Sequence, residues 1–286
     1  MNEYFFFAGY VVLQYVVLAT AWNILGGYAG YVNFGTGAFF AVGAYTAVAL
    51  YKAFALPLGL QILAGAAVSG LLGFGVGLLT LRLRGIFFSI ATIAVAIVLE
   101  TVVVNWHYVG GAKGLPTMRP AQAPFFESYT VWLFCVMAFM ALAAILCARY
   151  IETSWIGRGL RAIRDNEGAA ECSGVPTLRL KLAAATLSGA LMGAAGAPFA
   201  QYLSFIEPSS AFSLNYAINA LAMPMIGGMS HWTGPVIGAV LLGTVQQVVT
   251  VTISSEVNVL VVGVLLVIFV VAAPEGILGL YRKWRS

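Results

Sequence analysis

Charged side chains are scarce in this sequence. Asp, Glu, Lys and Arg together make up 8% of its 286 residues, whereas hydrophobic residues make up 61%. Soluble domains carry about 25% charged residues. Water does not solvate a surface with so little charge, so the composition excludes the soluble globular classes and predicts a membrane protein.

Residues and motifs that carry chemistry are equally sparse. The only histidines are His107 and His231, and no H-E-x-x-H pattern is present. Cys135, Cys147 and Cys172 show neither paired nor metal-ligand spacing. No G-x-x-x-x-G-K-[ST] phosphate loop occurs either. We therefore expect no catalytic residue, no metal site and no cofactor, and the chain is not predicted to be an enzyme.

Long apolar runs are abundant. A membrane-spanning helix needs roughly 20 mainly apolar residues, and the sequence offers about nine such stretches: 4–25, 34–51, 58–81, 86–104, 128–149, 180–202, 213–229, 235–253 and 257–273. They are too long and too continuously apolar for the strands of an outer-membrane barrel. The predicted fold class is all-α, a polytopic helical membrane protein with about nine transmembrane helices, within a range of eight to ten.

Two features refine the first two spans. The segment before 4–25 lacks a basic region, and no small-residue cleavage site follows the span, so we expect a retained helix instead of a removable signal peptide. The stretch 26–47 contains six glycines, a density unfavourable for a plain helix. It predicts a broken or re-entrant start to the second span. Gly189 and Gly193, four residues apart, predict a close helix crossing.

The basic residues are distributed unevenly between the two sides of the predicted bundle. One side receives eleven: Arg82, Arg84, Arg149, Arg158, Arg161, Arg164, Arg179, Lys181, Arg282, Lys283 and Arg285. The other side receives Lys52, Lys113 and Arg119. Positive charge favours the cytoplasmic side, so we expect the 150–179 loop and the C-terminus in the cytoplasm and the N-terminus outside. The net charge of +4 follows from this topology and gives no support to nucleic-acid binding.

One strongly charged stretch interrupts the apolar chain, at 154–175. Ser154 is a suitable N-cap, and Gly174 followed by Pro176 predicts a helix stop. Within the helix Ile156, Leu160 and Ile163 form an apolar stripe, and Arg164 can pair with Glu167. The helix is either a solvated amphipathic linker or a docking helix for a cytosolic partner. The small face formed by Ala169 and Ala170 and the mixed charges favour docking.

Polar residues inside the spans are candidates for a translocation path: Asn33, Thr36, Glu100, Asn215 and Asn219. Asn215 and Asn219 share a helix face, and Pro224 loosens the same helix. The alternative is that such groups only hold helices together. Glu100 lies near the outer end of its span, whereas an ion-coupled secondary transporter would place carboxylates at mid-depth. That class, and a channel-like subunit, remain alternatives.

The A-A-x-x-x-G pattern of Ala169, Ala170 and Gly174 resembles the coupling loop of bacterial ABC importer permeases. The surrounding sequence is similar to the branched-chain amino acid permease family in seven segments: 84–94, 110–116, 157–175, 181–197, 202–212, 226–239 and 274–280. The resemblance covers nearly the whole chain. It departs from the family at Gly168, where a glutamate is usual and Glu167 stands one residue earlier, and at Asn33, where a serine is usual.

The resemblance implies one transmembrane permease domain over 1–286, in the bacterial inner membrane. The implied partners are membrane lipid, a second homologous permease subunit, two cytosolic ATP-binding cassette ATPases and a periplasmic substrate-binding protein. The helix 154–175 would be the coupling helix, with these residues coupling it to the ATPases: Arg158, Arg161, Arg164, Asp165, Glu167, Ala169, Ala170 and Gly174. Branched-chain amino acids are the family's usual substrates, and urea or short amides are the alternative within it.

Overall fold

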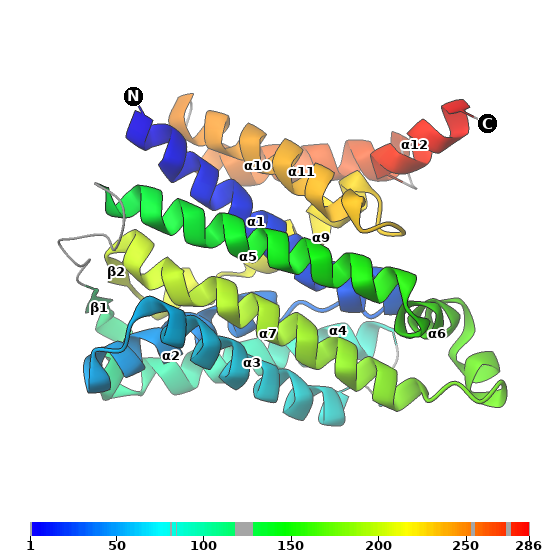
Figure 1. Ribbon diagram of the computed structural model, residues 1–286, viewed down its shortest axis with the longest axis horizontal. Coiled ribbons are helices and arrows are strands. Elements are labelled where there is room, and N and C mark those ends of the chain that lie inside the picture. The colour runs from blue at the N-terminus through cyan, green and yellow to red at the C-terminus, as the bar shows by residue number, and fades with distance from the viewer. Residues whose placement is uncertain are drawn as a thin grey trace.

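The computed structural model describes residues 2–285 apart from 81, 84, 118–127, 253–254 and 273–275. Its long helices run roughly along one axis, with the start of α1 at one end and α6 and α12 at the other (Figure 1). The helices are α1 Asn2–Ala29, α2 Thr36–Phe54, α3 Leu58–Thr80, α4 Ile86–Val104, α5 Tyr129–Thr153, α6 Trp155–Cys172, α7 Thr177–Leu203, α8 Pro208–Ala211, α9 Leu214–Gly227, α10 Thr233–Thr252, α11 Ser255–Ala272 and α12 Gly276–Arg285.

Short elements lie at the end opposite α6. The 3-10 turns η1 His107–Val109 and η2 Gly111–Lys113 follow α4. The strands β1 Leu115–Pro116 and β2 Phe205–Ile206 pair antiparallel, with Leu115 opposite Ile206. Strands of two residues do not alter the class, and the predicted all-α fold is confirmed.

Each of the nine predicted spans coincides with a helix. Seven of the described helices are long and apolar enough to cross a membrane: α1, α2, α3, α4, α5, α7 and α10. The other two predicted spans correspond to α9, with 14 residues, and α11, with 18 residues. At 1.5 Å per residue α9 rises about 21 Å, less than the roughly 30 Å of the hydrocarbon layer. The chain beside α9 therefore has to supply the remaining depth.

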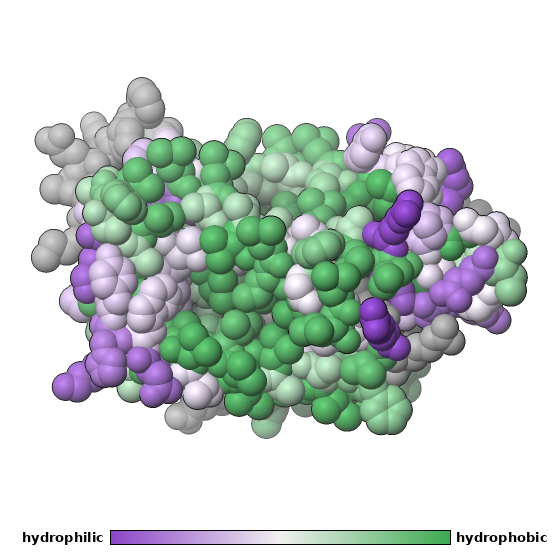
Figure 2. All heavy atoms as spheres, turned by 90° about the horizontal axis from the view of Figure 1, so that it is seen from below, coloured by the Kyte–Doolittle hydropathy of each residue, from purple (hydrophilic) through white to green (hydrophobic). Residues whose placement is uncertain are grey.

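The distribution of hydrophobic residues on the surface is the one expected of a protein surrounded by lipid. Figure 2 shows hydrophobic residues across the middle of one face and hydrophilic residues gathered towards its two ends. The outer helix α4 contributes to this surface, because only 17% of its most apolar stretch is buried, against 61% for α7. Exposed large side chains such as Ile86, Phe87 and Ile90 contact hydrocarbon at no cost, whereas in water each would oppose folding.

The core is built around α7, which packs against α2 and α3. Small residues permit this close approach. A Cβ placed on Gly43 of α2 would overlap the carbonyl oxygen of Gly193 in α7, and one on Gly193 would lie 2.6 Å from the Gly65 oxygen of α3. A Cβ on Gly189 would lie 2.8 Å from the backbone carbonyl oxygen of Ser69 in α3. The predicted close crossing at Gly189 and Gly193 is confirmed.

A short non-helical segment precedes the second span, and whether it makes that span broken or re-entrant stays a prediction. Residues 30–35 are non-helical between α1 and α2, and Gly30 has φ +77°. The following residues lie beside α1, where the Trp22 indole Nε1 donates to the Asn33 carbonyl oxygen at 2.8 Å. How deep this segment lies in a bilayer stays a prediction.

The crossing of α2 and α7 generates a stability prediction. Gly43→Ala forces a methyl group into the Gly193 backbone, and we expect it to lower the free energy of unfolding by about 1–3 kcal/mol. Gly75→Ala is the matched control, because nothing lies within 4 Å of a Cβ at that position on α3. Thermal unfolding of the two purified variants in one detergent checks this. Equal melting temperatures would contradict the packing described above.

Candidate functional site

The charged helix α6 lies at one end of the bundle, between α5 and α7 (Figure 1). Its predicted apolar stripe is confirmed: Leu160 and Ile163 are buried, Ile156 is partly buried, and they join a cluster with Tyr28 of α1 and Leu180 of α7. Ser154 does occupy the N-cap position, but its hydroxyl donates back to the Ile151 carbonyl at 2.7 Å and caps nothing. The helix is therefore held to the bundle by its apolar face.

A kink divides α6 into two pieces, where the sequence predicted one helix. Asn166 has φ −160° and ψ 105° inside the helix. Its side-chain oxygen accepts a hydrogen bond from the Ala169 backbone N–H at 3.1 Å, which is an N-cap interaction for a second short helix. Gly174, with φ +81°, ends that helix at the predicted position.

The second piece presents an exposed tip. Between 164 and 174 most residues are exposed, including Asp165, Gly168, Ala169 and Gly174. The exceptions are Glu167, which is partly buried, and Ala170, which is 4% exposed. Of the two alanines in the A-A-x-x-x-G pattern, one therefore faces outward and the other packs inward.

The three predicted coupling arginines differ in their contacts. Arg161 donates to the Glu152 carbonyl oxygen at 3.0 Å, near the end of α5, and Arg164 donates to the Gly27 carbonyl oxygen at 2.9 Å, near the end of α1. Both cations satisfy carbonyls at helix C-termini, where the helix dipole favours positive charge. Arg158 is exposed, with a weaker contact of 3.4 Å to the Thr153 oxygen. Two of the three therefore fasten α6 to the bundle.

Glu167 turns inward. Its carboxylate accepts from Lys181 Nζ at 2.6 Å and from the Tyr31 hydroxyl at 2.8 Å. Lys181 Nζ also donates to the Tyr31 oxygen at 3.1 Å. The sequence had suggested Arg164 as the partner of Glu167, and it treated Lys181 only as a topology signal. Nothing in the helical spacing pointed to Tyr31, which lies 136 residues away in the chain.

A second carboxylate, Glu152, joins other segments at the same end of the bundle. It accepts from the Trp232 backbone N–H at 2.6 Å and from the Tyr28 hydroxyl at 3.2 Å, and His231 Nε2 lies 3.9 Å away. These contacts hold the α9–α10 connection against the ends of α1 and α5. Among the described residues, no group of three or more His, Cys, Asp or Glu side chains could hold a metal ion.

The predicted path residues of the second span lie at its break. Asn33 is 5% exposed, and its side-chain oxygen accepts from the Gly35 backbone N–H at 2.7 Å. Thr36, the first residue of α2, is fully buried, and its hydroxyl has no hydrogen-bond partner among the described residues. The segment is also fastened to α4, since Thr92 accepts from the Phe34 N–H at 3.1 Å and Ser89 donates to the Val32 oxygen at 2.9 Å.

The other three path candidates are spread apart. Asn219 is 8% exposed and joins three helices: it donates to the Tyr15 hydroxyl of α1 at 3.2 Å and accepts from Gln246 of α10 at 2.7 Å. Asn215, one turn earlier, is exposed. Glu100 is half-buried on α4, eight residues, or about 12 Å of helix rise, beyond Thr92. The structure brings only Asn33, Thr36 and Asn219 into the interior.

Two helix breaks meet in that interior. The chain between α7 and α9 is interrupted at 204–213, and a Cβ on Gly37, at the start of α2, would lie 2.9 Å from the Ser213 oxygen. Just beyond, the rings of Phe40 and Tyr216 have centroids 4.8 Å apart. Interrupted helices whose ends converge are a recurrent feature of transporter binding sites. This convergence is the best candidate for the centre of a path.

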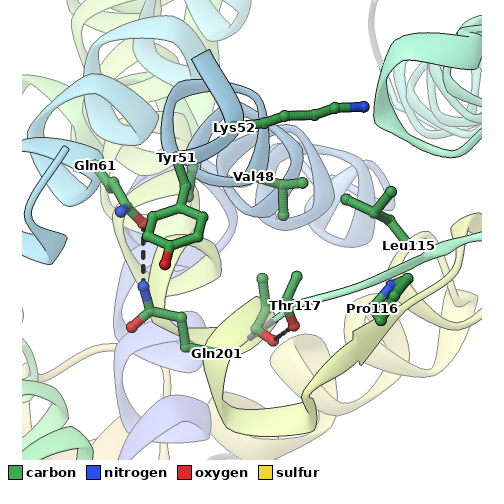
Figure 3. A pocket seen from close by; sticks show the side chains of 10 residues that line it. Val48, Tyr51, Lys52, Gln61, Leu115, Pro116, Thr117 and Gln201 are labelled. Atoms are coloured by element: carbon green, nitrogen blue, oxygen red, sulfur yellow. Dashed lines mark hydrogen bonds between the residues drawn. The ribbon is translucent and has the colours of Figure 1, made fainter. Parts of the chain in front are cut away.

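A cavity of about 250 Å³ lies at the end opposite α6, between α2, α3, α7 and β1. Figure 3 shows the amides of Gln61 and Gln201 facing each other beside Tyr51, joined by a hydrogen bond of 3.4 Å, while Lys52 extends away. Both glutamines are buried, and Tyr129 donates to Gln201. Sequence reasoning missed these two residues because glutamine inside an apolar span has no pattern that separates a lining role from helix packing.

Comparison with known proteins was made for the whole chain. Residues 4–270 match the family described as "Branched-chain amino acid transport system / permease component". No solved structure matches.

Individual relatives agree with the family. The chain is 26% identical to the high-affinity branched-chain amino acid transport system permease protein LivM of Salmonella typhimurium, and equally to LivM of Escherichia coli, over 95% of this chain and 69% of each relative. It is 26% identical to the permease protein LivH of Salmonella typhimurium over 52% of this chain and 46% of that protein. Because the family match covers nearly the whole chain, the chain belongs to the family of permease components of branched-chain amino acid transport systems.

Proposed function

We propose that this chain is the transmembrane permease subunit of an ATP-binding cassette importer. It forms a translocation path for branched-chain amino acids or related small polar solutes across the bacterial inner membrane. The observation that carries the proposal is the exposed tip of α6, a capped short helix with the A-A-x-x-x-G pattern, on a bundle of the permease family. ATP hydrolysis belongs to separate subunits, and this chain is not an enzyme.

The proposed partners supply what an importer needs besides this chain: ATP hydrolysis, delivery of the solute and a second permease subunit. Two cytosolic ATP-binding cassette ATPases dock on the α6 tips of two permease subunits, and a periplasmic binding protein delivers the solute at the opposite end. The relatives named LivM and LivH are two different permease proteins of branched-chain amino acid transport systems. That pairing supports a second, homologous permease subunit as the partner of this chain.

The proposed orientation places α6 in the cytoplasm. Arg82, Arg149 and Arg179 lie in or beside helix ends that share the α6 end, whereas Lys52 and Lys113 lie near η1 and η2 at the other. Basic residues concentrate on the cytoplasmic side of inner-membrane proteins. The 150–179 segment and the C-terminus are therefore cytoplasmic, and the start of α1 is outside.

The proposed path combines apolar walls with a few amides. Asn33, Thr36 and Asn219 lie near the converging helix breaks, and the cavity with Gln61 and Gln201 lies towards the outer end. Such a lining suits a solute with an apolar side chain and polar groups that need hydrogen bonds. Branched-chain amino acids meet this description, and urea or short amides are the alternative that the same amides would accept.

Transport in reconstituted vesicles tests the function. With the ATPases, the second permease subunit and the binding protein present, we expect radiolabelled leucine, isoleucine or valine to accumulate only when ATP is supplied on the α6 side. Competition by unlabelled urea or acetamide separates the alternative substrates. Accumulation driven by a proton gradient in vesicles without the ATPases would instead identify an ion-coupled carrier.

The docking tip generates a separate prediction. Ala169→Arg places a long cation on the exposed tip, and we expect recovery of the ATPases with the purified permease to fall about tenfold or more, the size of effect seen at interface hot spots. Ala53→Arg is the matched control. It makes the same change at an exposed position in the last turn of α2, at the end of the bundle opposite α6. Both are measured by co-purification from one membrane preparation. Equal recovery with the two variants would show that the ATPases dock elsewhere.

A further inference from the structure

Three side chains connect the coupling helix to the break before α2. Glu167 belongs to the second piece of α6, Lys181 to the first turns of α7, and Tyr31 to the non-helical segment 30–35. Each of the three contacts the other two, at 2.6, 2.8 and 3.1 Å. The Lys181 ammonium also lies 4.9 Å from the centroid of the Tyr31 ring.

This group is buried and charged. The Lys181 side chain is 4% exposed and the Glu167 side chain 13% exposed. A charge in that position is stable only while its partner stays in place. The Tyr31 hydroxyl donates to the carboxylate and accepts from the ammonium, which ties the tyrosine to both charges. The three side chains therefore move as a unit or lose their pairing.

The kink at Asn166 gives the second piece of α6 two different faces. Gly168 and Ala169 are exposed, whereas the Glu167 side chain is 13% exposed and faces the bundle. Arg164, just before the kink, donates to the Gly27 oxygen at the end of α1. A partner that displaces the exposed face must carry Glu167 with it.

Tyr31 connects this group of three side chains to the candidate path. Tyr31 is two residues from Asn33 and five from Thr36, where α2 begins. There the chain comes within contact distance of Ser213 at the second helix break. Gly30 and Tyr31 still donate backbone hydrogen bonds to Gly26 and Leu25 at the end of α1. Beyond them, the side chains of Trp22, Ser89 and Thr92 bind the backbone of residues 32–34.

We propose that Glu167, Lys181 and Tyr31 form the link through which a displacement of the α6 tip repositions segment 30–35 and the start of α2. The three are positioning residues, since none of them needs to touch the solute or the ATPase. The proposal rests on the proposed importer function. It also gives the departure at Gly168 a physical reading: in this chain the glutamate one residue earlier serves an internal contact.

A neutral replacement of the pair tests the link in the full complex. Glu167→Leu combined with Lys181→Met removes both charges of the pair together, which avoids leaving either of the two without the other. We expect the ratio of substrate-stimulated to basal ATP hydrolysis to fall about tenfold, within the range of coupling between distant sites. Glu167→Gln keeps one oxygen that can accept from Lys181, and its amide NH2 can donate to the Tyr31 hydroxyl, so this variant should retain more of the ratio.

The outcomes separate the link from the function. A double variant that keeps the wild-type ratio, in a complex that transports with ATP, overturns the link and leaves the importer function standing. A wild-type complex without ATP-driven uptake overturns both. Assembly with the ATPases is measured in the same preparations, so a lost ratio counts for the link only when docking is retained.

A pair of tyrosine variants gives an independent measurement. Tyr31→Phe removes only the hydroxyl that binds Glu167, and Tyr28→Phe removes a similar hydroxyl that binds Glu152 at 3.2 Å, outside α6. We expect Tyr31→Phe to lower the stimulated-to-basal ratio several-fold and Tyr28→Phe to leave it at the wild-type value, with equal melting temperatures. Equal ratios for the two variants would overturn the link.

Discussion

Every interruption of a helix in this bundle exposes backbone N–H and C=O groups that lipid cannot satisfy. The break at 30–35 meets this demand with side chains from two other helices: Trp22 binds the Asn33 carbonyl, Thr92 binds the Phe34 N–H, and Ser89 binds the Val32 carbonyl. These hydrogen bonds therefore determine the course of the backbone through the break. Its position at the start of α2 follows from the same partners.

Close packing makes the interrupted segments possible. Because α2, α3 and α7 cross at glycines, α7 brings its small residues near the backbone of both neighbours. Without that approach the ends of the two breaks, at Gly37 and Ser213, could not meet. The interior polar groups then concentrate where the helices are discontinuous, which is where a solute that needs hydrogen bonds would find them.

Much of the architecture can be read from the sequence because lipid imposes it locally. Apolar runs of about 20 residues predicted every long helix. The amphipathic pattern of Leu160 and Ile163 predicted which face of α6 is buried. These features depend on residues close together in the chain, so periodicity and composition are sufficient.

The side-chain partners could not be read in the same way. Glu167 was assigned to a neighbour on its own helix, but the kink at Asn166 redirects it to Lys181 and to Tyr31. Asn215 and Asn219 have identical spacing signals, yet only Asn219 is interior, because Asn215 falls in the exposed first turn of α9. Contacts between distant segments depend on how the helices dock, and no local pattern encodes that.

The small β1–β2 pair has a consequence for how this chain can vary. Leu115 stands opposite Ile206, and the next residue along, Thr117, donates its N–H to Ser204 and its hydroxyl to Ala200. Because strand side chains alternate between faces, deleting a single residue between Gly114 and Thr117 would turn that hydroxyl away from α7. Changes of length in the loop after α4 are therefore confined to positions outside this short ladder.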